Sequence, residues 1–139
     1  MLRSFVSAAA LATSFLAVAP LAQAEGDPAK GDELFNKYSL GGSRCATCHN
    51  LQVDRPKIGP SLYGVIGRKA GESDGYKARY SQTLKDADMV WDEETITKYL
   101  TQKDYLPDNL MWRQAYSGIS EEQAAHIVAY IKENGGMGE

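Results

Sequence analysis

Apolar residues recur at helical spacing in three separate segments of this 139-residue chain. The first predicted helix begins at Asp27-Pro28, because a capping residue is followed there by proline at the first helical position. Its apolar face contains Gly31, Leu34, Phe35 and Tyr38. Since glycine lowers the stability of a helix, Gly31 predicts a place where another helix crosses closely.

The second helix is predicted over residues 93–101, with Asp92 as its N-cap. Trp91 before the cap and Ile96 within the helix have the spacing of a hydrophobic staple. A short helix is also expected within residues 77–85. These elements are brief, so they must pack against something larger to be stable.

The last helix is predicted over residues 120–134. It opens with the capping box Ser120-Glu121-Glu122-Gln123, and Gly135-Gly136 stops it. Its apolar face contains Ala124, Ile127, Val128 and Ile131. Residues 50–68 contain several prolines and glycines, residues 101–117 contain Pro107, and both segments lack helical spacing. No alternating strand pattern of useful length occurs, so the chain is predicted to be all-α.

Residues 1–24 have the pattern of a secretory signal peptide. Arg3 supplies a positive start, residues 5–21 are almost wholly apolar, and Ala22-Gln23-Ala24 forms a cleavage site. An uncleaved membrane anchor is the alternative, because the apolar run is nearly long enough to span a bilayer. Pro20 and the cleavage site favour removal after Ala24 and export to the periplasm.

The remaining residues, 25–139, are enough for one domain. All 18 acidic residues and 14 of the 15 basic residues lie in this part, so its formal net charge is −4. Nucleic acid is therefore not expected as a partner. A domain of this size has a limited core, which a large bound cofactor would extend.

Cys45-Ala46-Thr47-Cys48-His49 has the C-x-x-C-H pattern of covalent haem attachment. Two thiols three residues apart can reach the two vinyl groups of one porphyrin, and the histidine that follows can ligate the iron. C-x-x-C alone would also fit a dithiol redox motif or half of a zinc site. The chain has only two cysteines, and its second histidine, His126, is distant in sequence. No βαβ pattern surrounds the motif, so haem c is the expected cofactor.

A family resemblance rests on this motif together with residues on either side of it. They are Gly31, Phe35 and Tyr130 in the first and last helices, Gly59-Pro60, Leu62, Gly64, Gly67-Arg68-Lys69-Ala70-Gly71, Trp91 and Tyr99-Leu100. In these features the chain resembles the class I c-type cytochromes, near mitochondrial cytochrome c and its soluble bacterial periplasmic relatives. The resemblance implies a fold in which the first and last helices cross and shorter helices and loops wrap round one covalent haem.

The iron ligands implied by the resemblance are His49 and Met111. Methionine sulfur as second axial ligand raises the potential of an electron-transfer haem. Three methionines are assigned to the signal peptide, core packing and the glycine-rich tail: Met1, Met89 and Met137. Met111 lies between the last two predicted helices, where the family carries its ligand, although the segment from Met111 to Gly118 is longer than usual. Bis-histidine ligation and an open sixth site remain alternatives, and His126 is expected to face solvent.

Further haem contacts are implied at five positions. The Pro60 carbonyl would accept the second N–H of the ligating imidazole. Arg68, Tyr80 and Trp91 are candidates to bind the two haem carboxylates, which must be satisfied if they are partly buried. Tyr99 would lie in the core near Met111 and could donate a hydrogen bond to the ligand sulfur.

The expected function is that of a soluble periplasmic one-electron carrier, not an enzyme, that meets oxidase, reductase or dehydrogenase partners transiently as a monomer. Basic residues flank the expected haem contacts and could steer an acidic partner: Arg44, Lys57, Lys103 and Arg113. One alternative is a haem with a labile sixth site that acts on peroxide or binds a gas. A second is a dedicated subunit held in a periplasmic dehydrogenase, for which a large exposed apolar patch would be expected.

Overall fold

The computed structural model describes residues 25–40, 42–114 and 116–138, so the predicted signal peptide, residues 1–24, lies outside the described residues. The elements in chain order are α1 (Pro28–Asn36), α2 (Cys45–Cys48), the 3-10 turn η1 (Lys77–Arg79), α3 (Gln82–Asp86), α4 (Glu93–Thr101), α5 (Leu110–Gln114), α6 (Glu121–Ile131) and the π-helical turn η2 (Lys132–Gly136). The described residues form no strand, only isolated bridges. The all-α prediction is confirmed. Nowhere in the described ranges is a helix long and apolar enough to span a membrane.

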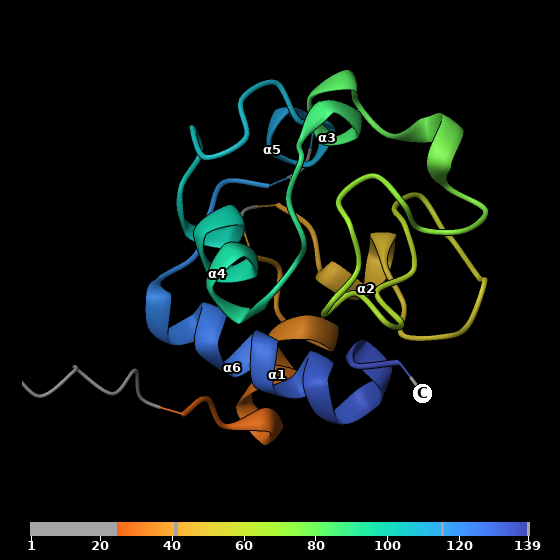
Figure 1. The fold of residues 1–139 in the computed structure, drawn as a ribbon. Helices are drawn as coiled ribbons and strands as arrows, with labels where there is room; N and C mark the ends of the chain where they lie inside the picture. Colours follow the sequence, from red (N-terminus) through yellow and green to blue (C-terminus); the bar gives the residue numbers. More distant parts are fainter. Residues whose placement is uncertain (1–24, 41, 115, 139) are drawn as a thin grey trace, which may run out of the picture.

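Helices α1 and α6 cross closely at one end of the molecule, whereas α3 and α5 lie at the other end (Figure 1). The crossing is possible because Gly31 has no side chain: a Cβ there would collide with the His126 carbonyl oxygen and lie 2.6 Å from the Tyr130 Cβ. One turn further along, the rings of Phe35 and Tyr130 pack with their centroids 5.3 Å apart. The close crossing predicted from Gly31 is confirmed.

Side chains cap each of the three longer helices as the sequence predicts. The Asp27 carboxylate accepts the N–H groups of Ala29 at 2.9 Å and Lys30 at 3.3 Å. Asp92 accepts the N–H of Thr95 at 2.7 Å, and the Thr95 hydroxyl accepts the Asp92 N–H at 2.8 Å. The predicted capping box from Ser120 to Gln123 is also formed. These caps satisfy N–H groups that have no partner within their own helix.

The structure corrects the sequence prediction in three places. The short helix expected in residues 77–85 is two elements, η1 and α3. The segment 101–117, expected to be irregular, contains α5, whose Trp112 N–H is accepted by the Asn109 side chain at 3.1 Å. A helix of five residues is too short to show helical spacing in the sequence, so its pattern did not predict it. The last helix ends at Ile131 and passes into η2, which closes with Gly135 at a φ of 99°.

His126 does not face solvent, contrary to the prediction. Its side chain is only 13 % exposed. Its Nδ1 accepts the backbone N–H of Asp27 at 2.8 Å, which ties α6 to the start of α1. The chain's second histidine is therefore part of the helix crossing.

Candidate cofactor-binding site

A deep cavity opens beside α2 and encloses about 1190 Å³ of space, its open mouth included. Its wall is mostly apolar and includes Phe35, Leu62, Val65, Leu84, Ile96, Leu100, Ile127 and Ile131. Buried apolar side chains of α1, α4 and α6 thus form part of the cavity wall.

Eight of the nine residues implied by the resemblance line this cavity. They are Cys48, His49, Pro60, Arg68, Tyr80, Trp91, Tyr99 and Met111. The ninth, Cys45, lies at the other end of the α2 turn, where burial raises the pKa of its thiol to about 11. The structure brings the residues together from α2, α4, α5 and the loops between them; their role in binding stays a prediction.

The His49 imidazole is held on one side by the loop that follows it. Its Nδ1 lies 2.8 Å from the Pro60 carbonyl oxygen, to which an Nδ1–H would donate. Gly59 lies close to the ring, where a Cβ would collide with the imidazole carbon Cε1. Burial lowers the pKa of His49, although the bond to Pro60 acts in the opposite direction. The ring is therefore neutral, with Nε2 available as a metal ligand.

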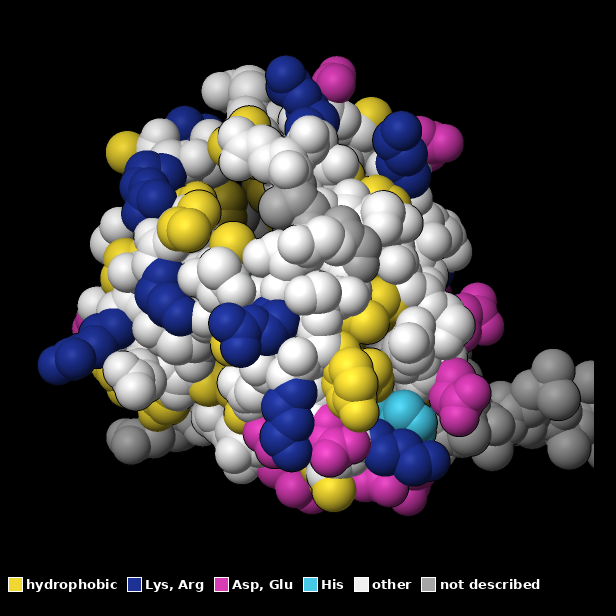
Figure 2. All heavy atoms as spheres, turned by 180° about the vertical axis from the view of Figure 1, so that it is seen from behind, with side chains coloured by type: hydrophobic (Ala, Val, Ile, Leu, Met, Phe, Trp, Pro, Cys, Tyr) yellow, Lys and Arg dark blue, Asp and Glu magenta, His cyan; other side chains and the backbone are white. Residues whose placement is uncertain are grey.

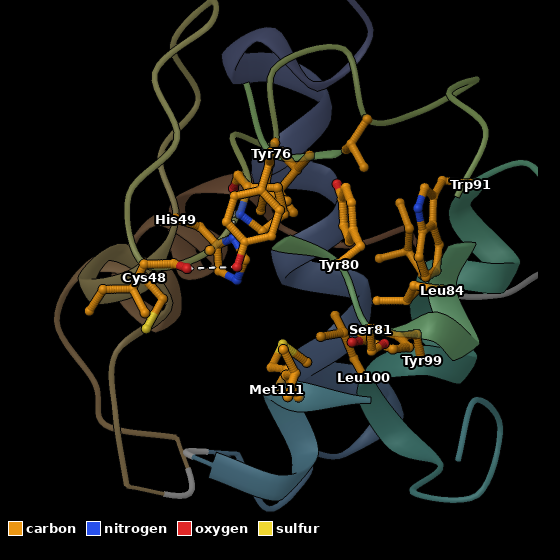
Figure 3. A pocket seen from close by; sticks show the side chains of 18 of the residues that line it. Cys48, His49, Tyr76, Tyr80, Ser81, Leu84, Trp91, Tyr99, Leu100 and Met111 are labelled. Carbon is orange, nitrogen blue, oxygen red and sulfur yellow. Dashed lines mark hydrogen bonds between the residues drawn. The ribbon is translucent and has the colours of Figure 1, made fainter. Parts of the chain in front are cut away.

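Met111 projects from α5 toward the same space that His49 faces from α2 (Figure 3). Asn109, only 1 % exposed, stands at the base of α5. Its Oδ1 accepts the Tyr99 hydroxyl at 3.0 Å, and the Trp112 indole N–H donates to the Tyr99 carbonyl at 2.9 Å. The Tyr99 hydroxyl thus has Asn109 as its acceptor, and a hydrogen bond from it to the Met111 sulfur stays a prediction.

The three candidates for carboxylate binding, Arg68, Tyr80 and Trp91, differ in the contacts that they already make within the protein. The Arg68 guanidinium donates to the carbonyls of Tyr63 at 2.7 Å and Ser61 at 3.0 Å, and burial lowers its pKa. Arginine has five N–H donors, so others remain available. Burial raises the pKa of the Tyr80 hydroxyl, which keeps it a donor. Trp91 packs edge-on against the Tyr99 ring at 5.2 Å.

Several cavity residues carried no signal in the sequence. Ser81 lines the cavity, and its hydroxyl is a buried oxygen with no hydrogen-bond partner among the described residues. Such an orphaned donor fits a carboxylate-bearing guest. Tyr76 and Arg79 also line the wall, and both donate to backbone carbonyls. Neither residue type nor spacing distinguishes these positions.

The residues fit a haem in shape and in chemistry. The cavity has an apolar wall for the macrocycle, a neutral imidazole on one side, a thioether sulfur on another, and polar donors at Arg68, Tyr80 and Ser81. The described part of the chain holds no cluster of three or more His, Cys, Asp or Glu side chains that could bind a metal by themselves. His126 is not among the cavity residues, so bis-histidine ligation has no second histidine here.

Comparisons of the sequence and the fold with known proteins all find cytochromes c. The sequence model of the cytochrome c family matches residues 28–135. Cytochrome c of Theileria annulata is 38% identical over 112 residues, which cover 78% of this chain and 87% of that protein. Cytochrome c2 iso-2 of Magnetospirillum fulvum is 38% identical over 90 residues, covering 63% of this chain and 88% of that protein. The solved structure of cytochrome cH from Methylobacterium extorquens superposes with a TM-score of 0.63 at 32% identity and covers 78% of this chain and 99% of that one.

Proposed function

Because the chain belongs to the cytochrome c family, we propose that it is a periplasmic one-electron carrier whose iron is held by His49 and Met111. The fold is that of the class I cytochromes c, and the family consists of electron carriers. Its cofactor is haem c, bound covalently through two cysteines, and the two cysteines of this chain are Cys45 and Cys48. The bound haem supplies the exchange of a single electron at iron.

The observation that carries the proposal is the pairing of His49 and Met111 at one cavity. On the proximal side, the Pro60 carbonyl fixes the tautomer of His49, leaving Nε2 for the metal. On the distal side, α5 presents the Met111 sulfur. A neutral imidazole and a thioether change no protonation state when an electron is gained or lost. The mostly apolar wall suits a macrocycle that exchanges an electron without a change in its surroundings.

The surface around the cavity suits brief contact with a charged partner. Figure 2 shows a hollowed face with hydrophobic side chains inside the hollow and Lys and Arg side chains spaced around it, while acidic side chains gather at the lower edge. The ion pairs of the described residues involve Lys37, Lys69, Lys77, Lys98, Lys132 and His126. Arg44, Lys57 and Arg113 take part in none of these pairs, so their charge is available to a partner.

The exposed apolar side chains support the transient carrier over the tightly held subunit. The large ones are Tyr38, Val53, Ile58, Val90, Leu110 and Met137. Only Ile58 and Leu110 among them line the cavity. Two exposed side chains beside a redox cavity are typical of small, short-lived interfaces, and permanent interfaces are larger and more apolar.

Export is proposed from the sequence, with cleavage after Ala24. The domain proposed to remain, residues 25–139, begins directly before a packed segment. Gly26 lies so close to α6 that a Cβ there would collide with the Ala125 carbonyl oxygen. The chain thus enters the folded domain within two residues of the proposed cleavage site.

Mass and absorption spectra of the exported protein test this proposal together. Denaturing mass spectrometry should give a polypeptide that begins at Glu25 and carries one covalent haem. The oxidised protein should show the weak far-red band of sulfur-to-iron ligation, and the reduced protein should not bind carbon monoxide readily. A bare polypeptide from cells with the haem-attachment machinery would refute haem binding. A high-spin spectrum without the far-red band would favour the labile sixth site instead.

A further inference from the structure

The loop of residues 57–60 carries the Pro60 carbonyl and yet has almost no apolar anchor. Lys57 is exposed, and the Ile58 side chain is 60 % exposed. Burial of side chains therefore contributes little to its position. A loop without buried side chains depends on its backbone hydrogen bonds for order.

Each of the four loop carbonyls has a donor, and three of the donor groups come from one distant turn. Arg79 donates from Nη1 to the Lys57 carbonyl at 2.9 Å and from Nη2 to the Ile58 carbonyl at 2.9 Å. The Tyr76 hydroxyl donates to the Ile58 carbonyl at 2.7 Å. Gly59 accepts the Lys57 N–H at 2.9 Å, and Pro60 faces His49. The turn at η1 thus fixes the outer half of the loop.

Tyr76 and Arg79, which together form a clamp on the outer half of the loop, are themselves held in place. Tyr76 is only 9 % exposed, and its ring packs edge-on against Tyr80 at 4.9 Å. The Arg79 guanidinium lies 4.3 Å from the centroid of the Tyr76 ring, within the range of a cation–π contact. In Figure 3 the Tyr76 hydroxyl points toward the side of the cavity where Cys48 and His49 lie. The buried Tyr76 ring therefore supports the exposed, charged guanidinium of Arg79.

The inner half of the loop transmits this position to the imidazole. The Gly59 N–H donates to the Cys48 carbonyl at 2.8 Å, and the Pro60 carbonyl faces the His49 Nδ1 at 2.8 Å. Gly59 lies so close to the imidazole that there is no space for a methyl group. A shift of the loop therefore lengthens the bond to His49 or changes the tilt of its ring.

We infer that Arg79 and Tyr76 are positioning residues for the iron ligand: they hold the 57–60 loop so that the Pro60 carbonyl keeps its hydrogen bond to His49. This rests on the proposed ligation by His49. The other nitrogen of a ligating imidazole normally donates to such an acceptor, which makes the ring a stronger donor to the metal. Loss of the two clamp residues weakens the hydrogen bond between His49 and Pro60. The imidazole then donates less to the iron, which favours the ferrous state.

The test compares Arg79→Lys, Arg79→Gln and Tyr76→Phe in the haem-loaded protein. Lysine keeps the charge but donates from one atom and lacks the planar two-nitrogen geometry with which Arg79 meets the two carbonyls. Tyr76→Phe removes only a neutral hydroxyl. The Gly59 amide should exchange its hydrogen about tenfold faster in the Arg79 variants, measured by NMR on the reduced protein. In Tyr76→Phe the rise should be about threefold, because the Ile58 carbonyl keeps the Arg79 donor. Arg79→Lys and Tyr76→Phe should also shift the reduction potential to a more positive value, whereas the loss of charge in Arg79→Gln acts in the opposite direction.

Lys77→Gln is the matched control. Lys77 lies in the same turn, but its side chain pairs with Glu72 at 2.7 Å and Asp74 at 3.7 Å instead of the loop. It should leave Gly59 exchange unchanged. An unchanged Gly59 rate in Arg79→Lys overturns the inference, as does a potential shift confined to Arg79→Gln, which would be an effect of charge alone. A wild-type spectrum without His–Met character would refute the proposed ligation instead, before any variant is compared.

Discussion

Trp112 ties the helix that carries Met111 to the end of α4, and its replacement by phenylalanine should loosen the distal ligand. The indole N–H donates to the Tyr99 carbonyl at 2.9 Å. That carbonyl is among the last four of α4, which have no partner within the helix. Trp112→Phe keeps an aromatic ring beside Tyr116, whose ring centroid lies 4.8 Å away, and removes the donor.

The size of the effect follows from the orphaned carbonyl. Leaving a buried acceptor unpaired costs about 1–3 kcal/mol, and each 1.4 kcal/mol is about a factor of ten in an equilibrium constant. The form in which Met111 is displaced should therefore be populated about tenfold more, or higher. Since cyanide binds only that form, its apparent affinity for the oxidised protein should rise by the same factor. Cyanide titration followed in the visible spectrum measures this directly.

Two further variants make the reasoning refutable. The Tyr116 hydroxyl donates to the Leu100 carbonyl at 2.5 Å, but that carbonyl also accepts the Ile119 N–H at 3.3 Å. Tyr116→Phe leaves it paired, so its cyanide affinity should rise only about threefold. Tyr38→Phe, on a side chain 54 % exposed, should change nothing. Wild-type affinity in Trp112→Phe, or a larger effect in Tyr116→Phe, would show that these bonds do not hold the ligand.

Three other outcomes are expected. Met111→Ala should abolish the far-red band and admit cyanide or carbon monoxide, whereas Met89→Leu should keep the band; the reverse result would refute the assignment of the ligand. Gly31→Ala should lower the free energy of unfolding in guanidinium by about 1–3 kcal/mol, because the collision with α6 exceeds the helix-propensity gain of about 0.5–1 kcal/mol. Replacing Arg44 and Arg113 together by glutamine should slow electron transfer to an acidic partner and flatten its salt dependence, and a wild-type rate that rises with salt would exclude attraction by these residues.

The sequence predicted the elements whose stability is local and the residues that belong to a covalent motif. The helices α1, α4 and α6 have periodic apolar faces and side-chain caps within three residues. Gly31 could be interpreted because glycine lowers helix stability, which favours a close helix contact over a merely tolerated glycine. The helix α5 could not be predicted in this way, because it has five residues and depends on contacts with α4.

The residues whose hydrogen bonds support the two proposed ligands were not predicted, for a different reason. Arg79, Tyr76 and Trp112 all donate to backbone carbonyls, 13 to 22 positions away in the chain. A carbonyl is present at every position, so no residue type marks it as a partner. The Asn109 side chain, which accepts the Tyr99 hydroxyl, was not predicted either.

The two proposed iron ligands are thus supported by separate parts of the molecule, and neither is part of the α1–α6 pair. His49 depends on the 57–60 loop and η1, and Met111 depends on α5 and the end of α4. The α1–α6 pair supplies the floor of the cavity and the closest helix contact. Because parts of a protein can open locally without global unfolding, each support can be weakened while the crossing stays intact. Substitutions at the crossing should therefore change unfolding with little effect on the spectrum, and substitutions at the supports should change the iron's environment first.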